Sequence, residues 1–413
     1  MKPSILSALL AFFLLGLVFT SCEKSDPEPQ PKKSKRTVLV YLVGKNDISG
    51  HLEDDYEEIK EGFSKLKSNE DFNLLVFISN RGSFVTPTLL KLESNKEGRV
   101  IEKIINTYNS SVEFNSTDSD VMRDILIEAY SRYPSESYGL VLESHADGWM
   151  PYPSIKARWF GDDRKKSITI TDLAKVLETV THSIGTKLDY ILFDACFMQS
   201  IEVAYELRNS VKHLIGSPTE IPGPGGPYDI LVPSLFDLSA NYSKHILDSY
   251  FEYYNELYTG YRSTLSWTMG VALSTIDLQY LEKFTEQTKQ LLTSTFDIRE
   301  TLDLSEIPYY DNRGGSSSYY SYKHFYFDIY YFMEYFLVDQ NKNLFAEWQK
   351  TFNQLVYYRT TPEVYTASPG KMISMEDTHG LSFYIPRLGY EPMTEHYKTH
   401  QWYRAGGWSD LGW

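Results

Sequence analysis

From Thr37 onward the chain alternates between short, strongly apolar segments and longer amphipathic ones, and this alternation restricts its fold more than any other feature. Thr37–Val43 and Asn73–Ser79 are apolar runs with the length of a buried strand. Glu53–Leu66, between them, has helical periodicity and acidic residues in its first turns, where the helix dipole favours negative charge. Strands that alternate with helices form a largely parallel sheet. The sequence therefore predicts an α/β fold.

The alternation continues to about residue 217 and then changes. Further strands are expected at Tyr138–Ser144, Leu188–Phe193 and His213–Ser217, and further helices at Asp118–Tyr133, Thr171–Val180 and Ser200–Arg208. Beyond the Pro/Gly run Pro222–Pro227 we expect helices at Leu235–Tyr258, Leu278–Thr293 and Tyr322–Leu337, and strands at Thr268–Ser274 and Gly380–Pro386. The 33 tyrosines are concentrated in the C-terminal third. We therefore expect a core at residues 37–234 and a helix-rich, aromatic region at 235–413 packed on it.

The N-terminal residues are expected to lie outside the fold. Lys2 precedes the apolar stretch Ile5–Phe19, which has the length of a secretory signal rather than of a membrane span. Small residues then lead into Cys22, the pattern at which bacterial lipoproteins are cleaved and acylated, so residues 1–21 are predicted to be a signal peptide and Cys22 the lipidation site. Residues 22–36 are charged and contain three prolines, which is typical of a disordered tether.

These features predict an exported protein, lipid-anchored to a bacterial membrane at the outer membrane or cell surface. The formal net charge of −15 argues against a nucleic-acid partner, because nucleic-acid binding depends on Lys and Arg contacts to phosphate. We expect a monomer that needs no cofactor.

The folded part contains a single thiol, Cys196, because the only other cysteine is Cys22. Cys196 follows the expected strand Leu188–Phe193, and His145 follows the expected strand Tyr138–Ser144. The carboxyl ends of parallel strands meet at one edge of a sheet, where ligands usually bind. A thiol and an imidazole at that edge are the minimum for nucleophilic catalysis. A helix opening near Met198–Ser200 would favour an anion at the thiol. From these residues alone, a buried structural thiol and a solvated histidine remain alternatives.

Three segments resemble the clostripain-like cysteine peptidases. Ser144–Trp149 is similar to that family's His-Gly-x-Gly-Trp loop, and Leu192–Leu207 resembles its cysteine segment almost position for position. Thr219–Gly225 is similar to its Glu-Pro-Gly-x-Gly loop, and the resemblance spans roughly Val38 to Pro386. It implies a caspase-like three-layer α/β sandwich with a mostly parallel central sheet, and a cysteine endopeptidase that acts on peptides or proteins.

The resemblance also implies roles for individual residues. Cys196 would attack the scissile carbonyl, and His145 would protonate the leaving amine. The backbone N–H groups of Ala146 and Cys196 would form the oxyanion hole, a contribution of a few kcal/mol in such sites. Asp194 would line the S1 pocket for a basic P1 residue, with a structural carboxylate or a helix N-cap as the alternative. Cleavage after Arg or Lys is therefore expected.

The chain departs from the family pattern at two positions. Ala146 replaces the glycine that follows the histidine, and Pro224 stands where an acidic residue sometimes completes a basic S1 pocket. Asp229 is a candidate substitute, and the absence of any second carboxylate is the alternative.

Some members of the family are nicked between the histidine and cysteine segments. Phe160–Ser167 contains Arg164, Lys165 and Lys166, and we expect self-cleavage there or, equally, a solvated loop. Some relatives depend on calcium, but the chain has no Asp-x-Asp-x-Asp-Gly loop, and Asp162–Asp163 and Asp54–Asp55 are only weak candidates, so no metal site is expected.

Two other functions fit the same sequence. One is a binding lipoprotein on a caspase-like scaffold, in which the aromatic C-terminal region binds the ligand and the dyad is inactive. The other is a thiol hydrolase or transpeptidase that acts on cell-wall peptides and differs from a peptidase only in pocket shape.

Overall fold

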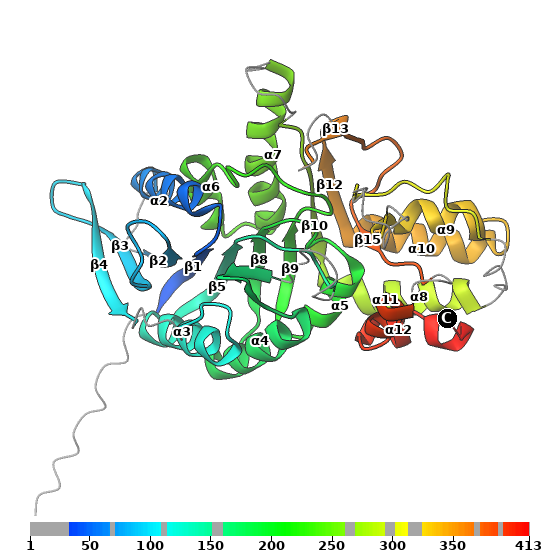
Figure 1. The fold of residues 1–413 in the computed structure, drawn as a ribbon, viewed down its shortest axis with the longest axis horizontal. Helices are drawn as coiled ribbons and strands as arrows, with labels where there is room; N and C mark the ends of the chain where they lie inside the picture. The colour runs from blue at the N-terminus through cyan, green and yellow to red at the C-terminus, as the bar shows by residue number, and fades with distance from the viewer. Residues whose placement is uncertain are drawn as a thin grey trace, which may run out of the picture. The chain divides into compact units, whose positions relative to one another are not determined.

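The protein is built around one nine-stranded sheet, and Figure 1 shows its strands side by side from β4 at one edge to β12 at the other. In spatial order the strands are β12 (Val356–Thr360), β10 (Ala272–Asp277), β9 (Val211–Gly216), β8 (Leu188–Asp194), β5 (Ser135–Glu143), β1 (Ser34–Gly44), β2 (Phe72–Asn80), β3 (Thr88–Ser94) and β4 (Val100–Thr107). This computed structural model describes residues 33–66, 71–108, 114–150, 160–260, 269–293, 302–312, 324–366, 372–386 and 391–412.

The five central strands, from β9 to β2, are parallel, and both edges are antiparallel. The central strands are mostly buried, and Val38 to Val43 in β1 have no exposed surface. A strand buried on both faces needs such a continuous apolar run, whereas a strand with one solvated face alternates.

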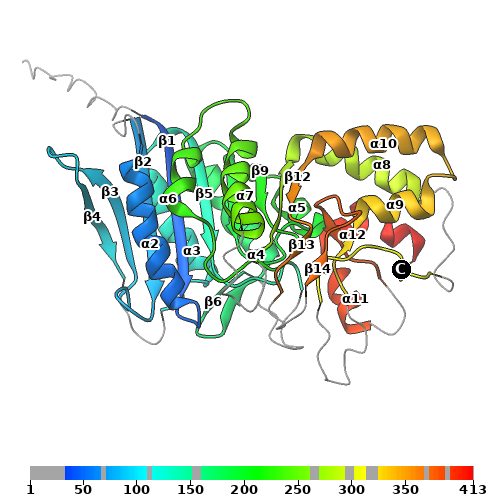
Figure 2. The ribbon, with the colours of Figure 1, turned by 90° about the horizontal axis from the view of Figure 1, so that it is seen from above.

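Helices cover both faces of the sheet (Figures 1 and 2). One face carries α2 (Ser49–Ser64), α6 (Tyr228–Leu235) and α7 (Tyr242–Gly260), which pack over the strand residues that include Val141 and Leu192. The other face carries α3 (Ser119–Arg132), α4 (Ile170–Ile184) and α5 (Ile201–Leu207) over residues that include Leu142 and Phe193. Successive strand residues point to opposite faces. Glu143 and Asp194 therefore point toward the α2–α6–α7 face.

The C-terminal elements extend the layer that contains α5. They are the 3₁₀ helix Leu278–Tyr280, α8 (Leu281–Thr293), β11 (Phe327–Asp328), α9 (Ile329–Leu337), α10 (Lys342–Leu355), β13 (Glu363–Val364), β14 (Ile373–Ser374), β15 (Ser382–Phe383), α11 (Glu391–Tyr397), α12 (Gln401–Ala405) and the 3₁₀ helix Trp408–Leu411. A small hairpin of β6 (Phe160–Asp163) and β7 (Lys166–Ile168) follows the histidine loop. No helix in the described ranges has the length and apolarity of a membrane span.

The expected three-layer α/β sandwich with a helix-rich C-terminal region is confirmed. Residues after 235 do more than pack on the core, because β10 and β12 are strands of the same sheet.

The end of the expected tether at residue 36 is wrong, since β1 already begins at Ser34. Arg36 is only 2% exposed, and its guanidinium binds the Asp189 carboxylate at 2.8 Å. The charged composition of this segment led to a prediction of disorder, because the sequence does not show that Arg36 has a buried ion-pair partner in Asp189.

Several expected helices also have different bounds. Leu235–Tyr258 is divided between α6 and α7, with a non-helical turn at Phe236–Asn241. In the expected helix Tyr322–Leu337, residues 324–328 are extended, 322 and 323 lie outside the described residues, and the helix begins at Ile329 with Asp328 as its N-cap. The cap of α4 is Thr169 rather than Thr171, because its side chain accepts the N–H of Asp172. The antiparallel pair β3–β4 was not expected.

Candidate active site

His145 lies just beyond the carboxyl end of β5, in a loop that is fixed on both sides. The carbonyl of His145 accepts the N–H of Gly161 at 2.9 Å, and the preceding Ser144 hydroxyl donates to the carbonyl of Val43 at 2.7 Å. The imidazole is partly exposed, with 27% of its side chain accessible. The loop is therefore held to both β1 and the β6–β7 hairpin, while the ring still faces the crevice.

Nε2 of His145 lies 2.7 Å from Oδ1 of Asp47, which follows β1. Asn46 holds this turn in place, because its side-chain amide donates to the carbonyls of Val43 (3.2 Å) and Asp162 (3.0 Å) and its oxygen accepts the N–H of Ile48 (3.0 Å). A carboxylate at one ring nitrogen fixes the tautomer and the orientation of an imidazole, leaving the other nitrogen for proton transfer.

Cys196 lies two residues beyond the carboxyl end of β8, the strand that pairs in parallel with β5. Its Sγ accepts the N–H of Ile221 at 3.4 Å. Burial raises the pKa of the Cys196 thiol to about 12, and the charge of Glu220 acts in the same direction. The thiol is therefore neutral at pH 7 in this state. α5 begins at Ile201 with Ser200 as its N-cap, at the end of the expected range, and the N–H that donates to the sulfur comes from the loop at Ile221.

The histidine and cysteine loops are packed directly on each other. Gly148 has a φ of +61°, and a Cβ there would lie 2.7 Å from the carbonyl oxygen of Phe197. Phe197 itself has a φ of +60°, which is uncommon for a bulky residue, and its ring stacks on Tyr326 at 5.1 Å. The Tyr326 hydroxyl donates to the carbonyl of Asp147 at 2.6 Å. One tyrosine of the C-terminal region thus holds both loops.

The backbone N–H groups of Ala146 and Cys196 are available as donors. In the part of the chain that the structure describes, neither group donates a hydrogen bond to the protein. Ala146 is nearly buried and pairs across the loop with Phe160 without using its N–H. Two unused donors beside a thiol suit an oxyanion hole.

Asp194 lies under the Pro/Gly loop on the α2–α6–α7 side. Its carboxylate is 2% exposed and accepts three hydrogen bonds, from the Gly226 N–H (2.7 Å) and from the hydroxyls of Tyr228 (2.9 Å) and Tyr250 (2.7 Å). Glu143 pairs with Asp194 in the sheet register and is 3% exposed.

A third carboxyl group, that of Asp55 in α2, is 2% exposed and lies beside Glu143. Burial, reinforced by the neighbouring carboxylates, raises the pKa values of Asp55 and Glu143, and burial raises that of Asp194. Oδ2 of Asp55 and Oε2 of Glu143 are buried without a hydrogen-bond partner. Within the described residues no Lys or Arg forms an ion pair with these three groups. We call Asp55, Glu143 and Asp194 the carboxyl cluster.

The other candidates from the sequence lie elsewhere. Asp229, at the start of α6, binds the ammonium group of Lys65 at 2.9 Å. Pro224 belongs to the loop that covers the carboxyl cluster, where a Cβ on Gly225 would lie 2.9 Å from Oδ2 of Asp194 and 3.5 Å from Oε1 of Glu143. Cys22 lies outside the described residues.

Arg164 and Lys165 form the two-residue turn of the β6–β7 hairpin, with φ of +55° and +68°, and Lys166 begins β7. All three residues are exposed. The turn is held by a hydrogen bond from the Lys165 N–H to Oδ1 of Asp162 (2.6 Å). The peptide bonds here are solvent-accessible but not extended.

Asp162 and Asp163 do not suit a calcium ion. Asp162 binds the turn, and Asp163 accepts both the N–H and the hydroxyl of Ser116, at 2.7 and 2.8 Å. Among the described residues there is no group of three or more His, Cys, Asp or Glu that could hold a metal.

The fold, with loops after adjacent parallel strands carrying the thiol and the imidazole, defines a cysteine peptidase of caspase-like architecture. The chain belongs to the clostripain family, whose model matches residues 40–413.

Solved structures agree with this assignment. A secreted C11 cysteine protease from Bacteroides thetaiotaomicron, solved with an irreversible peptide inhibitor, is 34% identical, covers 91% of this chain and 100% of its own, and superposes with a TM-score of 0.78. An inactive zymogen C11 protease from Parabacteroides distasonis is 26% identical over 91% of this chain and 99% of its own, with a TM-score of 0.73. Clostripain of Hathewaya histolytica is 28% identical over 224 residues, which cover 48% of this chain and only 41% of that relative.

Sequence reasoning missed Asp47 and Glu143, and it considered Asp55 only as a weak calcium candidate. Asp47 carried a signal, because it directly follows the first strand at the same sheet edge as His145 and Cys196. The carboxyl cluster had none, since its members lie far apart in the chain and meet only through the strand order.

Proposed function

We propose that this chain is an exported endopeptidase that uses a Cys196–His145 dyad and cleaves after Arg or Lys. The observation that carries the proposal is the pairing of β5 with β8, which brings both side chains to one edge of the sheet. Cys196 attacks the scissile carbonyl, and His145 takes the thiol proton and returns it to the leaving amine. Because the pKa of the free thiol is raised to about 12, this proton transfer accompanies attack rather than preceding it.

The other groups in the crevice support the same reaction. Asp47 holds His145 through Nε2, and we assign the proton transfer to Nδ1. The N–H groups of Ala146 and Cys196 stabilise the oxyanion, which is worth about 3 kcal/mol per donor in acyl-transfer sites.

We assign the basic P1 preference to the carboxyl cluster, with Glu143 as the second acid in place of the loop residue at Pro224. Buried carboxylates that lack a cation are costly, and an incoming guanidinium or ammonium group would provide one. The loop around Gly225 covers Asp194 here, so it has to move aside for the P1 side chain. Asp229 competes less well for this role, since Lys65 already neutralises it.

We also propose self-cleavage between the His and Cys segments, with Arg164, Lys165 and Lys166 as candidate P1 residues. The Parabacteroides relative is described as an inactive zymogen, which supports a precursor stage for this chain. Cleavage in the β6–β7 turn requires the hairpin to open, because its turn is tight. Mass spectrometry of the fragments identifies the bond, and a single intact band from protein that turns over substrate contradicts processing.

Attachment to the membrane is proposed to occur through acyl chains on Cys22. The Bacteroides relative is described as secreted, which is compatible with export of this chain. Cys22→Ser should move the protein from the detergent-soluble membrane fraction to the aqueous fraction. Unchanged partitioning would overturn the anchor.

The test of the main proposal is cleavage of peptidyl-coumarin substrates with Arg, Lys, Ala or Asp at P1, with Cys196→Ala as the control. Turnover of the Arg and Lys substrates alone, lost in the control, is the expected result. No turnover by folded protein, or turnover that survives in Cys196→Ala, would refute it.

A further inference from the structure

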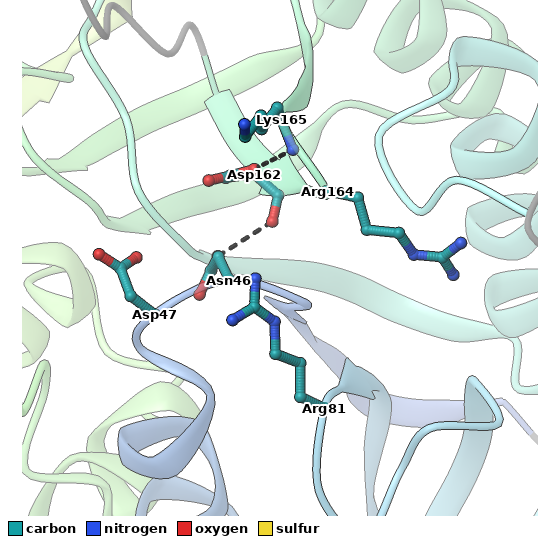
Figure 3. Close-up of a pocket in the computed structure, with 6 residues that line it drawn as sticks. All are labelled: Asn46, Asp47, Arg81, Asp162, Arg164 and Lys165. Carbon is teal, nitrogen blue, oxygen red and sulfur yellow. Dashed lines mark hydrogen bonds between the residues drawn. The ribbon is translucent and has the colours of Figure 1, made fainter.

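Figure 3 shows the residues that line a pocket of about 290 Å³ at the carboxyl edge of the sheet. Its lining comes from three places along the chain: Asn46 and Asp47 after β1, Arg81 after β2, and Asp162, Arg164 and Lys165 on the β6–β7 hairpin. Asp47 is also the residue that binds Nε2 of His145. The pocket therefore adjoins the imidazole that protonates the leaving amine.

Three cations, Arg81, Arg164 and Lys165, line the pocket against two carboxylates, Asp47 and Asp162, so the formal charge of its lining is +1. Asp47 binds His145, and Asp162 accepts the N–H of Lys165, so both carboxylates are already engaged. In contrast, Arg81 and Lys165 bond only through their backbone N–H groups within the described ranges. Figure 3 shows Arg81 directed toward Asn46, across the pocket from the turn that carries Lys165.

A further cation lies behind the pocket. Lys45, the residue before Asn46, is only 5% exposed, and no ion pair in the described part of the chain neutralises it. Burial lowers the pKa of Lys45, the positive charge of Arg164 lowers it further, and the negative charge of Asp163 acts in the opposite direction. Lys45 and Arg164 therefore lie in each other's field.

The strand order places the pocket on the side where the leaving half of a substrate emerges. Along the carboxyl edge the order is Cys196 after β8, His145 after β5, Asp47 after β1 and Arg81 after β2. A substrate that passes from the nucleophile over the general acid continues toward Arg81. Neighbouring strands are about 4.8 Å apart, so Arg81, two strands along from His145, lies about 10 Å beyond the residue that protonates the leaving amine. An extended peptide advances about 3.3 Å per residue and covers that distance in about three residues.

We propose that this pocket is a primed-side subsite that binds an Asp or Glu side chain at P2′ or P3′ of the substrate through Arg81 and Lys165. The inference rests on the proposed peptidase function and adds a second specificity element to it. The substrate class is then a peptide with a basic residue before the cleaved bond and an acidic one shortly after it.

The test uses the full chain and internally quenched peptides that share one sequence up to a P1 Arg. They differ only in carrying Asp, Ala or Lys at P2′ or at P3′. The Asp peptides are expected to have kcat/KM about fivefold above their Lys counterparts, the size of an exposed ion pair. The preference should shrink between about 0.02 and about 0.5 M sodium chloride, because exposed charges are screened.

Arg81→Glu should reverse the preference, so that the Lys peptides have the higher kcat/KM. Arg81→Gln should bring the Asp-to-Lys ratio of kcat/KM closer to one. Arg99→Glu is the matched control, since Arg99 is an exposed arginine of the β3–β4 turn, remote from the pocket, and should keep the wild-type order. Arg81→Gln carries the test if melting shows that Arg81→Glu does not fold.

Equal kcat/KM for the Asp and Lys peptides, or a preference that survives in folded Arg81→Gln and at high salt, would overturn the subsite. A peptidyl-coumarin with P1 Arg has no primed residues and separates the two proposals. If this coumarin substrate is cleaved but the Asp and Lys peptides react at equal rates, only the subsite is rejected. If neither the coumarin substrate nor any quenched peptide is cleaved, the peptidase function itself is rejected.

Discussion

The two sides of the dyad carry opposite charge in opposite environments. On the α2–α6–α7 side, Asp55, Glu143 and Asp194 are at most 3% exposed, and Asp194 accepts hydrogen bonds from two tyrosine hydroxyls and a backbone N–H. On the β1–β2 side, Arg81 and Lys165 are exposed to solvent around an open pocket. Charges interact more strongly where water is excluded and are screened where it is not. Selectivity should therefore be strong for the residue before the cleaved bond and weak for those after it.

Substitution of either dyad residue has the largest expected effect on kcat/KM, because both sides of the site act through the dyad. Cys196→Ala and His145→Ala should each lower kcat/KM by at least about 10³-fold on every peptide, whatever its P1 or primed residues, because nucleophile and general acid act as a unit. Stopped assays over hours measure the residual rate. A variant that keeps a tenth of wild-type activity would remove its residue from the dyad.

The P1 selectivity assigned to the carboxyl cluster is tested by replacing one of its carboxylates with an amide. Glu143→Gln and Asp194→Asn should each lower kcat/KM for P1 Arg by about 10²-fold, the loss of one charge-assisted contact in a dry site, and change the P1 Ala rate far less. The measurement is the Arg-to-Ala ratio, with melting curves to show that each variant folds. Asp229→Asn is the comparison: if it lowers the ratio and Glu143→Gln does not, Asp229 is the second acid.

The connection between the two sides is Asp47, which touches His145 and lines the basic pocket. Asp47→Ala should lower kcat about tenfold with little change in KM, a modest effect because 75% of the Asp47 side chain is exposed and water can replace it. Asp47→Glu should restore part of the rate. A purely structural role would lower the melting temperature without separating kcat from KM, and would leave the pH profile of kcat unmoved.

Sequence reasoning identified the centre of the fold and missed its edges for one physical reason. Strands β1, β2, β5, β8 and β9 are buried on both faces, so their continuous apolar runs are visible in the sequence. β4 has no buried residue and alternates poorly, so nothing in its composition marks it as a strand. The turn at Phe236–Asn241, between α6 and α7, is held by local hydrogen bonds in which Asp237 accepts the N–H and the hydroxyl of Ser239, a turn signal that the sequence analysis overlooked.

The candidate site divides in the same way. His145 and Cys196 were named because each directly follows an apolar run, and a resemblance supplied their roles. Glu143 was not named and Asp55 was considered only as a weak calcium candidate, because only the neighbourhood of β5, β8 and α2 brings them to Asp194. The local sequence pattern predicts which residues follow each strand. The order of the strands in the sheet decides which of these residues lie together, and the sequence pattern does not show that order.

The smallest expected effect concerns the stability of the buried side. The pKa of Asp55 in the folded protein is raised above its ordinary value of 3.8, by burial first and then by Glu143, Asp194 and Glu58. Above about pH 4 the folded protein therefore binds more protons than the unfolded chain, and stability falls as pH rises. Asp55→Asn cannot ionise but keeps an N–H donor for Glu143.

Asp55→Asn should therefore be more stable than wild type by about 1–2 kcal/mol near pH 8, with the difference vanishing toward about pH 4. Denaturant unfolding across that range measures it. Asp54→Asn is the matched control, because Asp54 is the exposed neighbour on the same helix and its removal leaves the carboxyl cluster intact. If both variants show the wild-type dependence on pH, the three carboxyl groups do not share their protons, and the strong P1 selectivity assigned to this side loses its electrostatic basis.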